Sequence, residues 1–277
     1  MKRIEYKQIN EELYTAILPN GLAVFVVAKR GFHKKYAFFA TDYGGIDRRF
    51  KVADKWVDTP AGVAHFLEHK MFDTKDGNAL EKLSATGASP NAYTSTDITA
   101  YHFECIDDFT ENLETLLSFV SIPYFTPESV KKEKGIITQE ILMIEDDPDY
   151  CLYYGLLRSL FKNNPVRDSV AGTVESIETI TADMLYDCHK IFYSPSNMAL
   201  CIVGDVEPAM IYDTAMKILP EKPTDAPLRD YGKPETLSPE TADIRKTMDV
   251  SLPIALVGCK INPAVHGEDT LRLEIVS

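Results

Sequence analysis

The chain has 277 residues, of which 45% are hydrophobic, so it is long and apolar enough to bury a sizeable core. Its 42 acidic residues against 29 basic ones give a formal net charge of −13, which argues against a nucleic-acid partner because phosphate backbones bind basic surfaces. No apolar run approaches the roughly 18 residues of a membrane-spanning helix, and five widely spaced cysteines indicate no disulfide framework, so we expect a cytoplasmic protein without a membrane partner.

The first elements that the sequence predicts are two strands. An Asn-Gly turn at Asn20 and Gly21 directly precedes an apolar, β-branched run, and a second apolar run over residues 35–41 ends before Gly44 and Gly45. We expect these two strands to be neighbours in a sheet.

A helix is predicted next, over residues 61–72. Thr59 is a residue type that caps helices, and Pro60 suits the first helical position because its fixed backbone angle is already helical. This helix carries the histidine motif described below.

Strands and helices then alternate irregularly. Residues 91–103 predict a strand, a polar turn and a second strand, and residues 108–120 have the apolar periodicity of an amphipathic helix. A further helix begins at Thr126 and Pro127 and ends before Pro148, because proline disfavours a helical conformation in the residue that precedes it.

The last part of the first domain is predicted to be a helix from Thr181, a buried strand over 198–205 and a helix over 208–219. With these elements the sequence completes one domain, residues 1–220.

The remaining residues predict a linker and an incomplete domain. Residues 221–246 combine several prolines with charged residues, a composition that favours an extended linker. Residues 247–277 contain one strand pattern, over 253–258, and a helix start near Thr270, too little to bury a core. We therefore expect 247–277 to be the beginning of a second, truncated domain.

The motif with the clearest chemistry is His65-Phe-Leu-Glu-His69. Residues four apart on a helix project from one face, so both imidazoles can share one ion, with Glu68 beside them. Zinc accepts imidazole nitrogens at about 2.0–2.1 Å and keeps an open position for water in catalytic sites. Because a metal lowers the pKa of its bound water toward about 7, a nearby carboxylate can accept the released proton. The motif predicts a zinc site with Glu68 as proton carrier; the alternative is an ordinary polar helix face.

A catalytic zinc needs a third protein ligand, and Glu140 is the candidate. Its neighbours at helical spacing are Ile136, Ile137, Met143 and Ile144, an apolar stripe that would bury it. A buried carboxylate is costly unless a cation or a proton neutralises it. The alternative is a carboxylate at the edge of the stripe that reaches water.

Glu133 lies two helical turns before Glu140 and nearly in line with it. From that position it can orient a ligand histidine. An exposed surface position is an equally good interpretation of Glu133 from the sequence.

The histidine motif, followed by Glu133 and Glu140 about seventy residues later, resembles the pitrilysin, insulin-degrading enzyme and mitochondrial processing peptidase family, and within it the bacterial insulinase-like branch. In this family an inverted His-x-x-Glu-His motif is completed by a distal glutamate. Further stretches resemble family landmarks in the family's order, at residues 18–22, 88–95, 170–177, 193–198 and 202–206.

The resemblance implies a fold and a set of roles. The fold is α+β, an antiparallel sheet flanked by helices, followed by the start of a second, similar domain. His65, His69 and Glu140 bind Zn²⁺, Glu68 is the catalytic base, and Glu133 is a further residue of the catalytic site.

The resemblance also assigns Asn91, Ala92 and Tyr93 to a strand edge that binds the substrate. A peptide that adds a strand to this edge is aligned by main-chain hydrogen bonds. Without the resemblance, an ordinary hairpin strand is the simpler interpretation.

The predicted function is that of a zinc-dependent endopeptidase that hydrolyses unstructured peptides. Complete family members pair this domain with a second one of similar fold, so we expect a carboxy-terminal half or a partner subunit, with a dimer as one form. The alternative is a non-catalytic or weakly active zinc-binding subunit of a heteromeric peptidase. Such subunits usually lack parts of the motif, whereas His65, Glu68, His69 and Glu140 are all present here.

Overall fold

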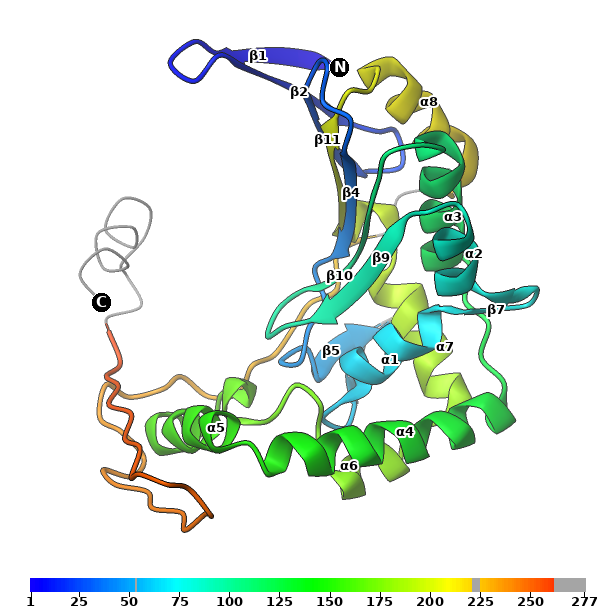
Figure 1. The fold of residues 1–277 in the computed structure, drawn as a ribbon. Helices are drawn as coiled ribbons and strands as arrows, with labels where there is room; N and C mark the ends of the chain where they lie inside the picture. The colour runs from blue at the N-terminus through cyan, green and yellow to red at the C-terminus, as the bar shows by residue number, and fades with distance from the viewer. Residues whose placement is uncertain (53, 221–224, 262–277) are drawn as a thin grey trace.

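The computed structural model describes residues 1–52, 54–220 and 225–261 and has a seven-stranded sheet at its centre (Figure 1). The strands are β1 (Lys2–Tyr6), β2 (Glu11–Ile17), β3 (Ala23–Ala28), β4 (Lys35–Thr41), β9 (Ser89–Thr94), β10 (Thr99–Cys105) and β11 (Met198–Gly204). They lie in the order β1-β2-β3-β11-β4-β10-β9. All neighbouring strands are antiparallel except β3 and β11, which are parallel.

Helices cover one face of this sheet and leave the other face open (Figure 1). They are α1 (Val63–Met71), α2 (Ala79–Ala85), α3 (Phe109–Ser121), α4 (Pro127–Glu145), α5 (Pro148–Leu160), α6 (Val174–Glu178), α7 (Ala182–Phe192) and α8 (Pro208–Ile218). Two short hairpins pair β5 (Arg49–Val52) with β6 (Lys55–Asp58) and β7 (Asp73–Thr74) with β8 (Gly77–Asn78). The predicted α+β fold is confirmed, with the single parallel pair as the departure from an antiparallel sheet.

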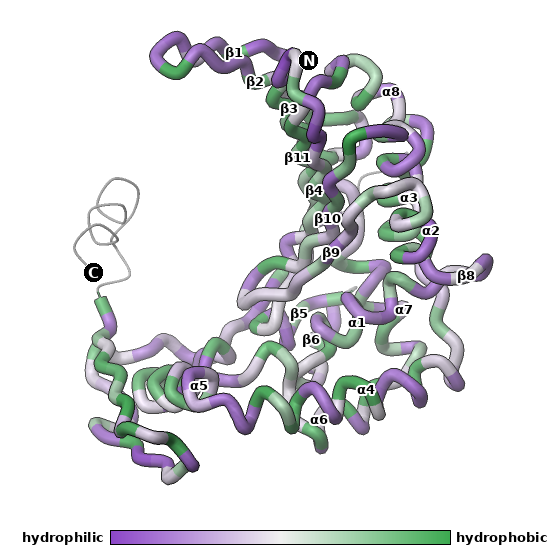
Figure 2. Tube along the Cα trace, in the orientation of Figure 1, coloured by the Kyte–Doolittle hydropathy of each residue, from purple (hydrophilic) through white to green (hydrophobic). Residues whose placement is uncertain are grey.

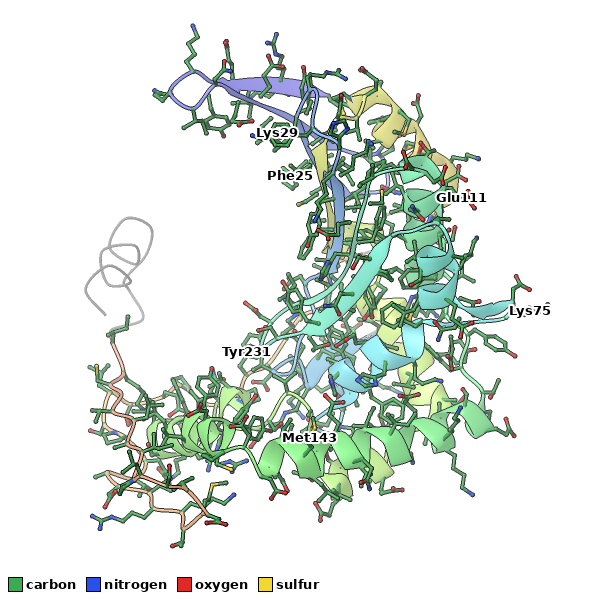
Figure 3. All side chains as sticks on the ribbon, viewed as in Figure 1. Phe25, Lys29, Lys75, Glu111, Met143 and Tyr231 are labelled. Carbon is green, nitrogen blue, oxygen red and sulfur yellow. The ribbon has the colours of Figure 1, made fainter. Side chains whose placement is uncertain are left out.

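The centre of the sheet differs from the prediction in one respect. β3 and β4 are not neighbours, because β11 lies between them, parallel to β3 and antiparallel to β4. Hydrophobic residues run along all three strands (Figure 2), and alternate ones such as Val24, Phe39 and Leu200 are fully buried under the helices. On the open face, Phe25 projects away from the helices (Figure 3). A local pattern indicates a strand but not its partner, which is chosen by packing across the sheet.

The helices α1 and α4 carry the predicted metal ligands, and the sequence predicts the ends of α4 better than those of α1. α4 begins and ends as predicted, since the Thr126 hydroxyl accepts the Ser129 N–H at 3.1 Å and Pro148 opens the next helix. α1 begins at Val63, two residues after the predicted start, and Gly62 rather than Thr59 is the residue at its cap. The Thr59 hydroxyl instead donates to the carbonyl of Arg48.

Gly62 has a physical reason to begin α1. Its φ of 92° lies in the left-handed region, and a Cβ atom there would approach the carbonyl oxygen of Ala171 to 2.6 Å. The start of the helix is therefore fixed by a close contact with a loop more than a hundred residues away, which no local pattern contains.

Part of the segment predicted as a linker packs against the first domain. Leu228 and Asp230 exchange backbone hydrogen bonds with β5, at 2.8 and 2.9 Å. Between them, Arg229 forms an ion pair at 3.2 Å with the buried carboxylate of Asp47, which also accepts the Tyr231 hydroxyl at 3.0 Å. This part of the linker is held by buried polar contacts.

The strand predicted over residues 253–258 does not form. No strand of the described chain pairs with this segment, and Val257 is 93% exposed. An apolar run needs a partner strand to satisfy its backbone groups, whatever its residue types. The helix predicted near Thr270 lies outside the described residues. Across the described ranges, no helix is both long and apolar enough to cross a membrane.

Candidate metal centre

α1 places two imidazoles on one side. Phe66 and Leu67 are fully buried and fix the helix between the sheet and α4. His65 and His69 then project together toward α4, with ring centroids 4.6 Å apart and ring planes at 69°. The four-residue spacing thus has the local consequence that the sequence predicts.

α4 places a carboxylate against both rings. Glu140 Oε1 lies 3.5 Å from His65 Nε2, and Glu140 Oε2 lies 3.4 Å from His69 Nε2. One ligand atom from each of the three residues falls within a group whose members are all within 4.8 Å of one another. The structure therefore brings together the three predicted metal ligands.

These distances fit a shared ion better than direct pairing. Two ligands at about 2.0–2.1 Å from a tetrahedral zinc ion are about 3.3–3.4 Å apart. A direct hydrogen bond from a charged nitrogen to a carboxylate is shorter, at about 2.7–2.9 Å. The observed 3.4 and 3.5 Å run to different oxygens of Glu140 and are closer to the first case than to the second. Two imidazoles and one carboxylate are also a donor set that zinc prefers in catalytic sites.

Glu133 contacts the far side of one imidazole. Its Oε1 lies 3.1 Å from His69 Nδ1, so Nδ1 carries the hydrogen and donates it to the carboxylate. Nε2 on the opposite side of the ring then faces Glu140, and its lone pair would be available to a bound metal ion. His65 differs, because its buried Nδ1 finds no hydrogen-bond partner in the part of the chain that the structure describes.

The electrostatics of the site favour a cation. Burial alone lowers the pKa of His69, but hydrogen bonds to Glu133 and Glu140 and the charge of Glu68 raise this pKa to about 10. The imidazoles of His65 and His69 hold the pKa of the Glu140 carboxyl far below its usual range. The carboxylates of Glu68, Glu133 and Glu140 thus surround the two imidazoles. A bound metal ion can supply the positive charge that protons on the imidazoles supply in its absence.

The structural reason predicted for Glu140 is wrong, although its position agrees with the prediction. Ile136 and Met143 are 48% and 67% exposed, and the Glu140 side chain remains 33% exposed. No continuous apolar stripe buries this carboxylate. Ile137, one residue of the predicted stripe, is buried together with Ile141 in the core, and α4 packs against α1.

Glu68 is held by a residue that the sequence analysis did not single out. The Glu68 side chain is largely buried, and its Oε2 accepts the hydroxyl of Thr94 at 2.7 Å. Thr94 is the last residue of β9, directly after the predicted substrate-binding residues. An inward-facing position in an alternating strand is the one pattern in the sequence that singles it out.

We expect Thr94→Val to lower the turnover of the predicted peptidase about tenfold. The reason is that the hydrogen bond from Thr94 holds the carboxylate of Glu68, and a hydrogen bond to a charged group contributes about 1.5–3 kcal/mol. Valine keeps the shape of the side chain but leaves Glu68 without its donor. Zinc content and substrate affinity should stay unchanged, because neither metal ligands nor the strand edge is altered. For the predicted peptidase, peptide hydrolysis by this chain together with its expected second half measures the effect, and equal turnover with Thr94 and with valine would contradict the role of Thr94.

The strand edge predicted to bind substrate lies beside this site. β9 is the last strand of the sheet, and its outer side pairs with no strand of the described chain. α1, the helix that carries the imidazoles, packs against β9 (Figure 1). On this edge the Ala92 N–H donates to the side chain of Asn91 at 2.8 Å, and Tyr93 is exposed. Asn91 and Tyr93 are therefore exposed on this edge, and Ala92 between them is half-buried against the core.

Two cavities differ in their relation to the site. One, of about 720 Å³, lies between the β5–β6 hairpin and α7 and includes none of the proposed metal ligands. A smaller one of about 220 Å³ adjoins the end of β9 and is lined by Thr94, Ser95 and Thr96 together with tyrosines of α5. Only the smaller cavity touches a residue of the candidate site.

Comparisons with known proteins agree with this geometry. Residues 57–174 match the family described as Insulinase (Peptidase family M16), and residues 179–277 match the Peptidase M16 inactive domain. The uncharacterized zinc protease YmfH of Bacillus subtilis is 46% identical over 99% of this chain and 65% of its own length. The uncharacterized zinc protease SCO5738 of Streptomyces coelicolor is 30% identical over 54% of this chain and 34% of its own length.

Solved structures show the same fold. A putative M16-like peptidase from Alicyclobacillus acidocaldarius superposes with a TM-score of 0.77 at 40% identity, over 84% of this chain and 55% of its own. A protease from Helicobacter pylori, at 21% identity, has a TM-score of 0.69 over 81% of this chain and 53% of its own. The chain thus spans less than two thirds of the length of these relatives. On the two sequence-family matches and the relative at 46% identity, the chain belongs to the insulinase family, peptidase family M16.

Proposed function

We propose that this chain is the zinc-binding catalytic half of a peptidase that hydrolyses unstructured peptides. The observation that carries the proposal is the group formed by His65, His69 and Glu140, with ligand atoms within 4.8 Å of one another beside the buried carboxylate of Glu68. Both curated relatives are named as zinc proteases, and these names support zinc as the metal.

Each residue of the site has a role in this proposal. His65 Nε2, His69 Nε2 and a Glu140 oxygen hold Zn²⁺, which when bound acts as a Lewis acid and lowers the pKa of water. Glu68 accepts a proton from the attacking water at one carboxylate oxygen and delivers it to the leaving amide nitrogen. Thr94 keeps the other Glu68 oxygen in place.

Substrate binding is proposed at the free edge of β9. A peptide that adds as a further strand replaces the local hydrogen bond between Ala92 N–H and Asn91 and places its backbone beside α1. Main-chain recognition of this kind requires an extended segment, which is the reason for proposing unstructured peptides as substrates.

The proposal includes a second half of similar fold, supplied by a carboxy-terminal continuation or by a partner subunit. The chain spans 65% or less of the relatives named above, which supports such a half. In this scheme residues 1–220 are the catalytic domain, 221–246 the linker and 247–277 the beginning of the second domain. A cytoplasmic location is supported by the five cysteines, which are all free thiols.

The test compares peptide hydrolysis by the 277-residue chain with hydrolysis by the completed protein at equal zinc content. We expect the chain alone to bind zinc but to cleave unstructured peptides at least about tenfold more slowly, because an uncovered site loses substrate orientation and exclusion of water. Removal of zinc by a chelator should abolish cleavage, and added zinc should restore it.

Each other outcome contradicts a different part of the proposal. Equal specific activities would show that one half is sufficient. Absence of zinc from both proteins would contradict the metal centre. Stoichiometric zinc without cleavage in the completed protein would favour the alternative, a non-catalytic subunit of a heteromeric assembly.

A further inference from the structure

A buried lysine directly follows the second histidine of the metal centre. The Lys70 side chain is only 1% exposed, and it is among the largest fully buried side chains of the described chain. Lysine is almost never fully buried unless its charge is paired, because an unpaired ammonium in an apolar interior is very costly. The position of Lys70 therefore calls for a specific partner.

The ammonium group of Lys70 has two carboxylate partners. One is Asp73 of β7, with which it forms a close ion pair. The other is Glu133, whose Oε2 lies 3.9 Å from Lys70 Nζ. Because Glu133 Oε1 contacts His69 Nδ1 at 3.1 Å, a single carboxylate lies between the buried cation and a proposed metal ligand.

Helix geometry explains how two successive residues reach the same carboxylate. Neighbouring residues on a helix point about 100° apart, so His69 faces the ion while Lys70 follows the buried side marked by Phe66, one turn earlier. The methylene stem of Lys70 can cross this apolar region and release its charged end beyond the helix. There, at the carboxyl end of α1, the helix dipole also favours a cation.

We infer that Lys70 is a positioning residue of the metal centre. Its fixed positive charge holds Glu133 Oε2, which leaves Oε1 directed at His69 Nδ1 and thereby directs His69 Nε2 at the ion. Within the described chain, Lys70 is the one basic residue besides His69 that pairs with Glu133. The inference rests on the proposed zinc site. It adds Lys70 as a residue that orients the ligand His69 through the carboxylate of Glu133.

The asymmetry between the two histidines supports this role. His65 Nδ1 has no hydrogen-bond partner among the described residues, so no second side chain fixes that ring from behind. His69 is fixed from behind, and the carboxylate that fixes it is itself paired with a cation. Loss of the Lys70 charge should therefore weaken zinc binding mainly through a change in the orientation of His69.

The experiment measures the zinc dissociation constant of the 277-residue chain by competition with a chelator. Lys70→Met keeps the length of the stem and removes the charge. We expect it to weaken zinc binding about tenfold, the lower end of the range for loss of a partner behind a metal ligand. Unfolding temperatures of the zinc-free proteins verify that each variant is folded.

A matched control is Lys134→Met. Lys134 follows Glu133 on α4, and its Nζ lies at the same 3.9 Å from its own carboxylate partner, Glu178 of α6, which does not belong to the metal centre. Zinc affinity should stay unchanged in this variant. An equal loss in both variants would indicate a general effect of charge and overturn the inference.

A double-mutant cycle separates positioning from packing. Glu133→Gln should itself weaken zinc binding, and Lys70→Met should then add less than about twofold, because the two residues act through one contact. Unchanged zinc affinity in Lys70→Met, or the full loss in both backgrounds, overturns the inference. If Lys70→Met does not fold, Lys70→Gln, which keeps a polar end for Asp73, is measured with the same outcomes.

The same measurements distinguish failure of this inference from failure of the proposed function. A wild-type chain that does not bind zinc contradicts the metal centre as a whole. A wild-type chain that binds zinc, together with a Lys70→Met variant that binds it equally well, contradicts only the role of Lys70.

Discussion

Glu68→Gln is expected to retain zinc and to lose turnover by roughly 10²- to 10⁴-fold, the contribution of a positioned general base. Glutamine has nearly the same shape, so it can still accept the Thr94 hydroxyl that holds Glu68 at 2.7 Å. It cannot accept the proton of the attacking water. The variant therefore removes the proposed chemical step and leaves the surroundings of the site intact.

Zinc content and peptide cleavage are measured on the same preparation of the completed protein. Glu81→Gln, an exposed position on α2, is a suitable control and should change neither quantity. If Glu68→Gln loses zinc together with activity, Glu68 is a metal ligand and the assignment of a general base is wrong.

His65→Ala and Glu140→Ala are each expected to abolish zinc binding. Each variant removes one of three protein ligands, so the loss of affinity should exceed the roughly 10- to 100-fold that removal of a partner behind a ligand causes. In Glu140→Ala the two imidazoles also lose the carboxylate that now lies 3.4 and 3.5 Å from them.

Elemental analysis of the purified variants gives the zinc content per chain. His102→Ala is the matched control, because His102 lies on β10 among the aromatic rings of Tyr36, Phe38 and Tyr93 and outside the group of ligand atoms. It should retain one zinc ion. Stoichiometric zinc in both His65→Ala and Glu140→Ala would contradict the proposed metal centre.

The sequence by itself determined the parts of the site that depend on local geometry. The four-residue spacing of His65 and His69 placed both imidazoles on one face of α1, since any helix does so. Thr126 and Pro148 fixed the ends of α4, because a capping hydroxyl and a proline act on the residues next to them. The positions of Glu140 and Glu133 on this helix made them candidates for a third ligand and for a partner of a histidine, and the resemblance to a known family assigned them these roles.

The tertiary structure decided what lies next to these elements. The insertion of β11 between β3 and β4 and the start of α1 at Gly62 both depend on contacts between distant segments. Glu140 reaches the imidazoles because α4 packs against α1, and not because a continuous apolar stripe buries it.

Two further contacts at the site appear only in the folded chain. Thr94 reaches Glu68 from the end of β9, and Lys70 reaches Glu133 from the buried side of α1. The local sequence pattern predicts which face of a strand or helix a residue occupies. It does not predict the residue's partner, which belongs to another element dozens of residues away. The energy that selects such partners comes from burial and charge pairing across the whole domain, so it has no local signature in the sequence.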